Sequence, residues 1–189
     1  MTGKSVRVGI IGAGGIARGY HLRSYRHCPG VEVVAACDIN AAALESLQTE
    51  HGIERVYTHY AEMLVNERLD LVSICTSNDM HYPAAMAAMA HGVAITVSQA
   101  RHMVAAAEDR GIKTGVNFSH RRTPAVMLAK EILDSGALGE IYYASAIYAA
   151  GGVNYAARPG TWRNDREKAG YGGLGDMGSH VIDMMMWLL

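Results

Sequence analysis

The sequence has little of three features that would place a protein in a special class. Its formal net charge is −1, and it has no basic block of the kind that binds nucleic acid or an anionic membrane. The three cysteines are isolated, so neither a disulfide framework nor a zinc site is expected. No apolar run is long enough to span a bilayer, and the N-terminus lacks a signal peptide's apolar core. These absences favour an ordinary cytoplasmic globular protein that needs no metal.

What is present indicates one full domain and part of another, since 189 residues exceed one typical domain. The first two-thirds alternates short β-rich runs with alanine-rich helical ones, which predicts an α/β fold with a doubly wound parallel sheet of Rossmann type. Cys37 and Cys75 lie in the apolar runs VEVVAACD and DLVSICT, so we expect buried, reduced thiols. The expected strands are 6–11, 31–38, 70–76 and 112–118, and the expected helices are 15–27, 41–52, 81–92 and 98–111.

After about residue 120 the pattern changes. TPAVMLAKEILDSG predicts a helix with Thr123 as N-cap, Pro124 at its first position and Gly136 at its end. GEIYYASAIYAAGG (139–152) predicts a long strand, and the final segment predicts a helix. We therefore expect a dinucleotide-binding domain over 1–120 and a partial α/β domain for substrate and dimerisation over 121–189.

The stretch VGIIGAGGIA lies between the first strand and the first helix. Gly12 permits a tight turn, Gly14 lets the backbone approach a pyrophosphate, and the small Ala17 lets the helix pack on the strand. Free amides at the helix start, around Gly15 and Ile16, would face the phosphates. A plain turn between strand and helix is the alternative.

Asp38 ends the second strand, where a carboxylate binds the ribose hydroxyls of NAD and repels the extra phosphate of NADP. Ile39 and Asn40 add no cation for that phosphate. Arg18 and Arg55 are cations that could bind it, so NADP is the alternative cofactor, but they do not reverse the preference for NAD. The residues thus favour NAD as the cofactor, and a solvated turn aspartate is the alternative.

The glycine loop is followed in order by DLVSICTSNDMH, GVNFSHRRTPAV, GALGEIYY and GGLGDMGSHVIDMMMWLL. With these five motifs the chain, from about residue 5 to its last residue, resembles the glucose–fructose oxidoreductase, inositol 2-dehydrogenase and rhizopine-catabolism family (Gfo/Idh/MocA). The resemblance implies a nicotinamide-dependent oxidoreductase acting on a sugar or polyol, with a Rossmann domain and a second α/β domain carrying an open sheet.

The same resemblance implies roles for individual residues. Thr76, Asn78 and His81 match a loop that borders the cofactor, with Ser77 in place of its usual proline; a first-turn helix residue is the alternative for His81. On the substrate side it implies Asn117 of GVNF together with Trp162 and Arg163 of WRND. Ordinary packing for Trp162 and a surface ion pair for Arg163 remain alternatives.

Asp176 and His180 match the family's D-x-x-x-H pair. Oxidising an alcohol by hydride transfer needs a base for the hydroxyl proton, and an imidazole titrates near neutral pH. Residues four apart on a helix share a face, so we assign His180 as the acid/base and Asp176 as its orienting partner. An N-capping aspartate followed by a first-turn histidine is the alternative, and two ligands alone do not close a metal site.

The sequence departs from the family where a strand of the type K-H-V-x-x-E-K-P is expected. AMAAMAHG runs directly into VAITVSQARHMVAAAEDRG, and no lysine lies between residues 5 and 112. The family's lysine, which would stabilise a developing alkoxide, is therefore missing. VAITV has enough β-branched residues to take the vacant strand position, but it would shorten the connection to the next helix and would not restore the lysine.

The second departure is that family members continue well past the last helix. We expect an incomplete second domain and poor or absent activity, and a homo-oligomer only if that domain is complete. A catalytically silent NAD-binding protein is the competing hypothesis. Which sugar or polyol would bind cannot be read from the sequence, because the pocket is completed by residues that the chain lacks.

Overall fold

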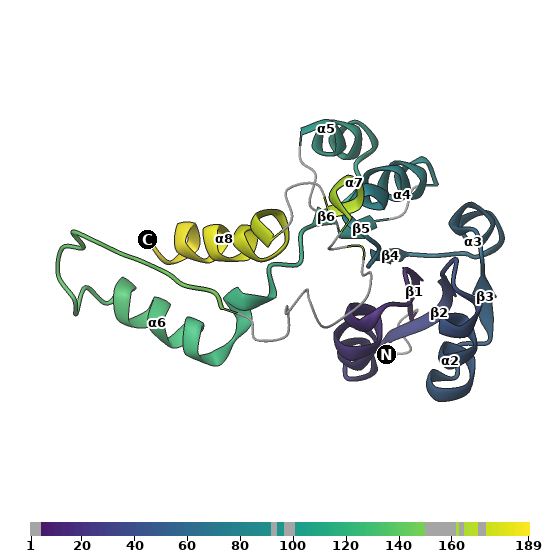
Figure 1. Ribbon diagram of the computed structural model, residues 1–189, viewed down its shortest axis with the longest axis horizontal. Coiled ribbons are helices and arrows are strands. Elements are labelled where there is room, and N and C mark those ends of the chain that lie inside the picture. The colour runs from purple at the N-terminus through teal and green to yellow at the C-terminus, as the bar shows by residue number, and fades with distance from the viewer. Residues whose placement is uncertain (1–4, 92–93, 97–100, 150–161, 163–164, 170–172) are drawn as a thin grey trace. The chain divides into compact units, whose positions relative to one another are not determined.

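The computed structural model describes residues 5–91, 94–96, 101–149, 162, 165–169 and 173–189 (Figure 1). The chain divides into two compact units, Met1–Val116 and Asn117–Leu189. None of the helices within these ranges is long and apolar enough to cross a membrane.

The first unit is built on a six-stranded sheet in which every neighbouring pair of strands is parallel. The strand order is β3-β2-β1-β4-β5-β6, which is the order of a doubly wound dinucleotide-binding fold. The predicted fold class is confirmed. The strands are β1 (Val6–Ile11), β2 (Val31–Cys37), β3 (Arg55–Tyr57), β4 (Leu71–Ile74), β5 (Ala94–Thr96) and β6 (Thr114–Gly115).

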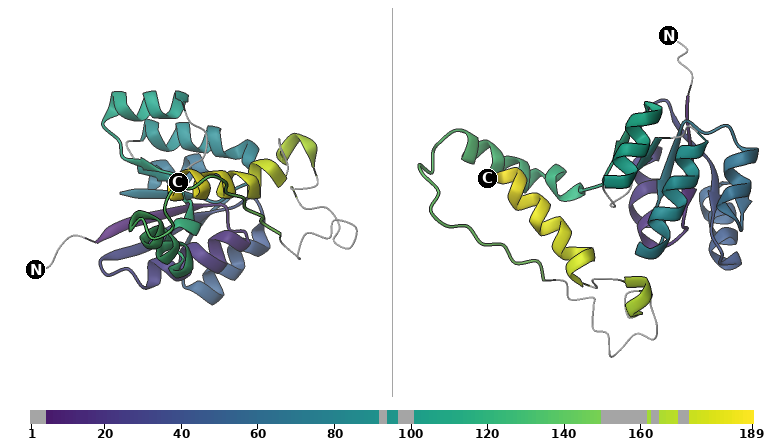
Figure 2. Two further views of the ribbon diagram at one scale, coloured as in Figure 1. Left: turned by 90° about the vertical axis from the view of Figure 1, so that its left-hand side faces the viewer. Right: turned by 90° about the horizontal axis from the view of Figure 1, so that it is seen from above.

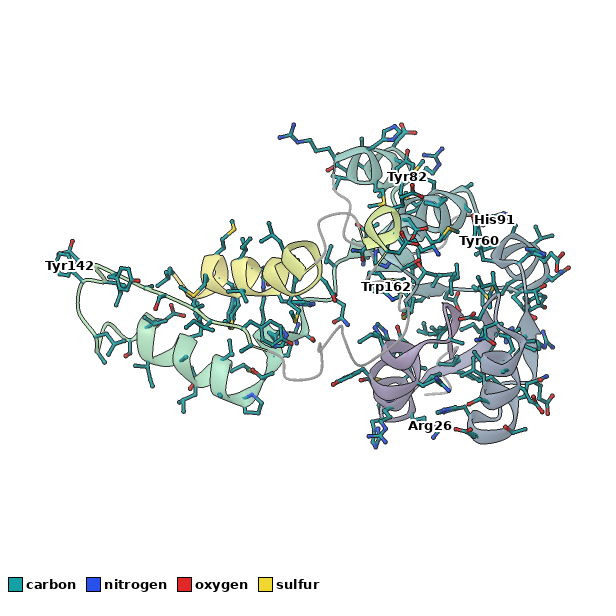
Figure 3. All side chains as sticks on the ribbon, viewed as in Figure 1. Arg26, Tyr60, Tyr82, His91, Tyr142 and Trp162 are labelled. Atoms are coloured by element: carbon teal, nitrogen blue, oxygen red, sulfur yellow. The ribbon has the colours of Figure 1, made fainter. Side chains whose placement is uncertain are left out.

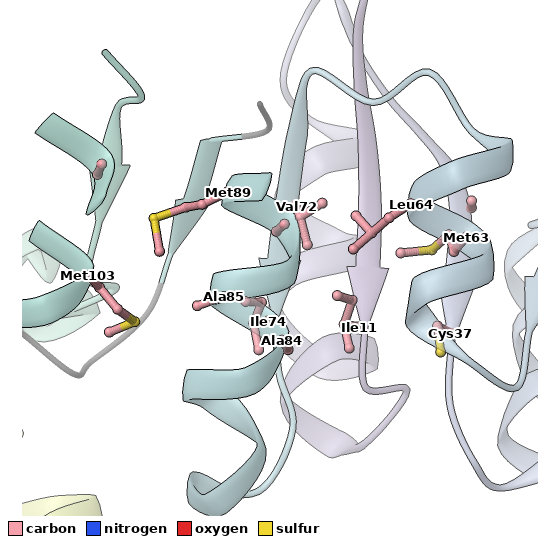
Figure 4. Close-up of a cluster of buried hydrophobic side chains, with 13 residues drawn as sticks. Ile11, Cys37, Met63, Leu64, Val72, Ile74, Ala84, Ala85, Met89 and Met103 are labelled. Carbon is pink, nitrogen blue, oxygen red and sulfur yellow. The ribbon is translucent and has the colours of Figure 1, made fainter. Parts of the chain in front are cut away.

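Helices cover both faces of this sheet (Figures 1 and 2). Buried side chains of β1 alternate between the faces, as successive residues of a strand must. Ile11 packs in one core cluster with residues of α3 and α4, whereas Ile10 packs in a second cluster with residues of η1, α1 and α2 (Figure 4 shows the first cluster). Burial on both faces explains why the strands read as continuous apolar runs. The helices are η1 (Ala17–His21, a π-helical turn), α1 (Leu22–Arg26), α2 (Ala41–His51), α3 (Tyr60–Asn66), α4 (Asn78–Ala90) and α5 (Arg101–Arg110).

Several predicted elements of the first unit differ in extent. The expected single helix over 15–27 consists of η1 and α1, and the expected strand over 112–118 has only the two residues of β6. The helix expected at 81–92 begins earlier, at Asn78, so Pro83 lies inside it rather than in its first turn. Neither β3 nor α3 was predicted from the sequence.

The position left vacant by the missing strand is filled by β5. Its three residues pair with β4 on one side and with β6 on the other, in parallel. The prediction that VAITV can take this position is therefore confirmed for residues 94–96. The sheet keeps its continuity although the lysine is absent.

The second unit contains η2 (Ser119–Arg122), α6 (Pro124–Asp134), α7 (Arg166–Ala169), η4 (Leu174–Gly178, π-helical) and α8 (Ser179–Leu188). Helices α6 and α8 pack against each other (Figure 2). Thr123 occupies the N-cap position of α6 as expected, but its hydroxyl donates to the His120 carbonyl instead of capping the helix.

The strand predicted over 139–152 is wrong for the part that the structure describes. Residues 141–149 form neither strand nor helix, and the side chain of Tyr142 points away from the helices (Figure 3). Tyr142 and Ile147 are 86% and 93% exposed. A strand needs a neighbouring strand for its backbone hydrogen bonds. Within the described part of this unit no such neighbour exists, so β propensity alone did not produce a strand.

Candidate functional site

The turn after β1 has the geometry that a dinucleotide-binding loop requires. Gly12 has φ +96°, and its amide donates to the Cys37 carbonyl at 2.8 Å. A Cβ built on Gly12 would lie 2.7 Å from the backbone carbon of Cys75, so only glycine fits between β1 and the end of β4. Ala17 is fully buried and packs in the core cluster beneath the first helix.

The next two glycines of the loop face open space. A Cβ built on Gly14 or Gly15 would meet no atom within 4 Å, and both residues are exposed. Ile16, 47% exposed, occupies the N-cap position of η1. Backbone amides at this helix start are therefore open to a ligand, as a bound phosphate would need.

Asp38 follows β2 and is tied to the loop. Its Oδ2 accepts a hydrogen bond from the Ala13 amide at 2.6 Å, and its Oδ1 accepts one from the Asn40 amide at 2.8 Å. These two bonds argue against a merely solvated turn residue. The carboxylate lies beside the glycine loop, at the place where a ribose would follow the phosphates.

Thr76, Asn78 and His81 lie between β4 and the first turn of α4. His81 Nε2 donates to the Thr76 carbonyl at 3.1 Å, so the ring is held against the loop. Burial lowers the pKa of His81. The carboxyl ends of β1, β2 and β4 thus bring together all the residues predicted to bind the cofactor, at the edge of the sheet where α/β folds bind ligands.

His180 lies in the first turn of α8, after Asp176 of η4, in the second unit. The Nδ1 atom of His180 is buried and has no hydrogen-bond partner among the residues that the structure describes. Burial is the main cause that lowers the pKa of His180; the charge of His120 adds to it, while Asp176 and Asp183 act in the opposite direction. The imidazole is therefore held towards its neutral, proton-accepting form.

Two family models match the chain. The model of the oxidoreductase family with an NAD-binding Rossmann fold matches residues 6–118, and that of the Gfo/Idh/MocA C-terminal domain matches residues 126–189. The chain belongs to the Gfo/Idh/MocA family. Its first unit is an NAD-binding Rossmann domain, as the glycine loop and Asp38 indicate.

Two curated relatives and one solved structure illustrate this membership. The chain is 31% identical to the D-apiose dehydrogenase of Paraburkholderia graminis, over 99% of this chain and 50% of the relative. It is 32% identical to the D-glucoside 3-dehydrogenase of Escherichia coli, over 100% and 55%. An NAD binding oxidoreductase from Klebsiella pneumoniae superposes with a TM-score of 0.79 at 30% identity, over 98% and 53%. The chain thus spans about half the length of these proteins.

The residues of the Gfo/Idh/MocA cofactor site fit NAD in this structure. Gly12 gives the required close approach, Gly14 and Gly15 leave room above the helix start, and Asp38 offers oxygens beside them. Cys37 is buried as expected, whereas Cys75 is only half-buried; burial raises the pKa of each thiol to about 12, so both stay protonated. No three His, Cys, Asp or Glu side chains gather as a metal site would need, within the ranges given above.

The residues predicted for the substrate side are placed less completely. Asn117 is exposed at the start of the second unit, and Trp162 is half-buried (Figure 3). Arg163 lies outside the described residues. These three assignments stay predictions.

Sequence reasoning missed a group of residues around His180. Phe118 and His120 contact the His180 ring edge-on, with ring centroids 5.5 and 5.0 Å away. Arg121 forms a two-pronged ion pair with Asp183 of α8, in which its Nε donates at 2.7 Å. The only signal in the sequence was their place in GVNFSHRRTPAV, about 60 residues before His180.

Proposed function

We propose that this chain carries the cofactor site and the alcohol base of a sugar or polyol dehydrogenase. The reaction moves a hydride between a secondary alcohol and NAD. The observation that carries the proposal is His180, a half-buried imidazole biased towards its neutral form, in the segment that matches the family's C-terminal model. The names of the two curated relatives support a sugar or a similar polyol, such as an inositol, as the substrate class.

In this proposal each predicted residue has one task. His180 accepts the proton of the substrate hydroxyl, and since its Nδ1 is buried, Nε2 is the nitrogen that takes it. Asp176, whose charge favours the protonated imidazole, steadies His180 after that transfer. Asn117, Trp162 and Arg163 contact the substrate. NAD, when bound, supplies the hydride acceptor.

The cofactor would be held by the first unit. The loop of Gly12, Gly14, Gly15, Ile16 and Ala17 takes the phosphates, and Asp38 takes the ribose; Thr76, Asn78 and His81 border the rest. Two observations favour NAD over NADP. Arg55 is engaged by Glu67 at 2.9 Å, and Arg18 donates to the Ser46 hydroxyl at 3.3 Å, so both cations already have a partner within the protein.

A second candidate function is NAD binding without turnover. It is favoured by the absence of any lysine between residues 5 and 112. Losing one electrostatic donor to the reacting oxygen can lower a rate on the order of 10²–10³-fold. We therefore expect slow oxidation rather than none, because the base is still present.

The test is NADH formation by the unmodified chain and by His180→Asn, over a panel of aldoses, glycosides and inositols. We expect slow turnover in the unmodified chain and a further loss of roughly 10²–10⁴-fold, down to background, in the variant, since an amide cannot take a proton. NAD affinity, measured by calorimetry, should stay the same. Binding of NAD with no turnover on any alcohol of the panel would contradict the dehydrogenase and support the second candidate.

The pH dependence follows from the lowered pKa of His180. The base acts when neutral, so the rate at pH 6.5, the ordinary imidazole value, should still exceed half of its high-pH value and should fall below half only at lower pH. A pH series of initial rates at saturating NAD measures this limb. A rate that is already halved above pH 6.5 would show that His180 is not the base or is not held neutral.

A further inference from the structure

The imidazole of His180 is one member of a row of rings in the second unit. His120 meets it edge-on, with 5.0 Å between ring centroids and an interplanar angle of 83°. His120 also meets Tyr148 edge-on, at 5.2 Å and 77°. Phe118 contacts His180 at 5.5 Å and 88°. Two rings from one short segment therefore determine how the His180 ring can turn.

A second contact fixes the distance between the elements that carry these rings. Arg121 is the neighbour of His120 in η2, and Asp183 lies three residues beyond His180 on α8. Their carboxylate–guanidinium pair uses both oxygens and two nitrogens, and Asp183 is only 10% exposed. A two-pronged pair of this kind fixes orientation as well as distance. The ion pair consequently holds His120 and His180 at a fixed distance and orientation.

Charged and titratable side chains near His180 lie on η2, η4 and α8, and α6 adds one at the far end of α8. Asp176 of η4 and Asp183 of α8 favour its protonated form, whereas His120 of η2 opposes it. Asp183 is paired with Arg121, and Lys130 of α6 lies at the other end of α8, where it donates to the Leu188 carbonyl at 3.4 Å. His120 is thus the titratable ring that acts on His180 at contact distance.

We propose that His120 is a positioning residue for the His180 base. Its ring orients the His180 imidazole by edge contact, and its charge opposes protonation of His180, so that the imidazole stays ready to accept the substrate's hydroxyl proton. The inference rests on the proposed function, in which His180 takes the hydroxyl proton. It assigns a role to a residue that the predicted site did not include.

The test is an NMR titration of the His180 ring in the unmodified chain and in His120→Phe, which keeps an aromatic ring but removes the charge. We expect the pKa of His180 to rise by up to about half a unit, which is the effect of removing a full unit charge about 5 Å away in the dielectric of water. The acid limb of the rate profile should move to higher pH by the same amount. His120→Gln should shift the pKa in the same direction, and it also removes the edge contact of His120 while the Phe118 contact stays.

His102→Phe is the matched control, because His102 is an exposed histidine that pairs with Tyr82 in the first unit and has no part in the site. It should leave the titration of His180 unchanged. An unchanged pKa of His180, within about 0.2 units, in both folded His120 variants would overturn the inference. The titration needs no turnover, so an inactive unmodified chain that still shows the shift would contradict the proposed reaction and not the coupling of the two rings.

Discussion

Gly12→Ala is expected to lower the affinity for NAD on the order of 100-fold, a loss of about 2.7 kcal/mol. The residue has φ +96°, which costs an alanine about 1–3 kcal/mol. Its Cβ would also lie 2.7 Å from the backbone of Cys75, which has no flexible end to move aside. The loop must therefore shift away from β4, and the amides that face the phosphates shift with it. Calorimetric titration with NAD measures the loss.

Gly30→Ala separates backbone strain from the close approach. Gly30 also has a positive φ, +75°, but a Cβ there would meet nothing within 4 Å, and the residue precedes β2 at the opposite edge of the sheet. This control should lower the melting temperature and leave NAD affinity intact. Equal affinity in Gly12→Ala and the unmodified chain would show that the turn after β1 is not the phosphate site.

Glu67→Ala is expected to lower the free energy of unfolding of the first unit by about 2–4 kcal/mol. Hydrogen bonds to a charged group contribute about 1.5–3 kcal/mol each, and solvent screening reduces the share of Arg55, which is 62% exposed. The Glu67 side chain is only 2% exposed. Its oxygens accept hydrogen bonds from the Tyr57 hydroxyl at 2.7 Å and from Arg55 at 2.9 Å, while Arg7 lies 3.5 Å away. One carboxylate thus links β1, β3 and the end of α3. Urea unfolding followed by circular dichroism measures the change.

Glu62→Ala on the same helix is the control for a lost negative charge. Glu62 is exposed in the first turn of α3, where its contribution is about 0.3–1 kcal/mol. Glu67→Gln should lie between the two variants, because its carbonyl oxygen can still accept from Tyr57 while its amide faces Arg55. A Glu67→Ala chain as stable as Glu62→Ala would show that the buried carboxylate contributes nothing net.

The sheet of the first unit was readable because its central strands are buried on both faces. A strand buried on both faces has a nearly continuous apolar sequence, as in VRVGII of β1 and VEVVAAC of β2. β3 has three residues, two of them with polar side-chain partners, so it left no such run. Glu67 binds two side chains of that strand, but nothing in the sequence distinguishes it from an exposed acidic residue.

The second unit was less readable because its conformation depends on contacts that no local pattern records. IYYASAIY has the composition of a strand, yet it is not one where no neighbour pairs with it. η2 and α8 are joined by Arg121 and Asp183, 62 residues apart, and their charges alone did not single them out.

The candidate site divides in the same way. The glycine loop and Asp38 follow from fixed spacings along two strands, and the structure adds the bond between Asp38 and the Ala13 amide. The pair of Asp176 and His180 was found by spacing, but His120 was not, since only the fold brings it to His180. The cofactor loop and the pair of Asp176 and His180 were predictable from local sequence, whereas the contact between His120 and His180 was not.

The most direct test of the central claim, that the first unit is an NAD site built on the glycine loop and Asp38, is a calorimetric titration with NAD and NADP. We expect one NAD to bind per chain and NADP to bind more weakly on the order of 10-fold, a difference of about 1.4 kcal/mol. We also expect Asp38→Ala to weaken NAD binding and to remove the preference, because the variant loses both the ribose acceptor and the bond to Ala13. An unmodified chain that binds neither nucleotide, or that prefers NADP, would contradict the account.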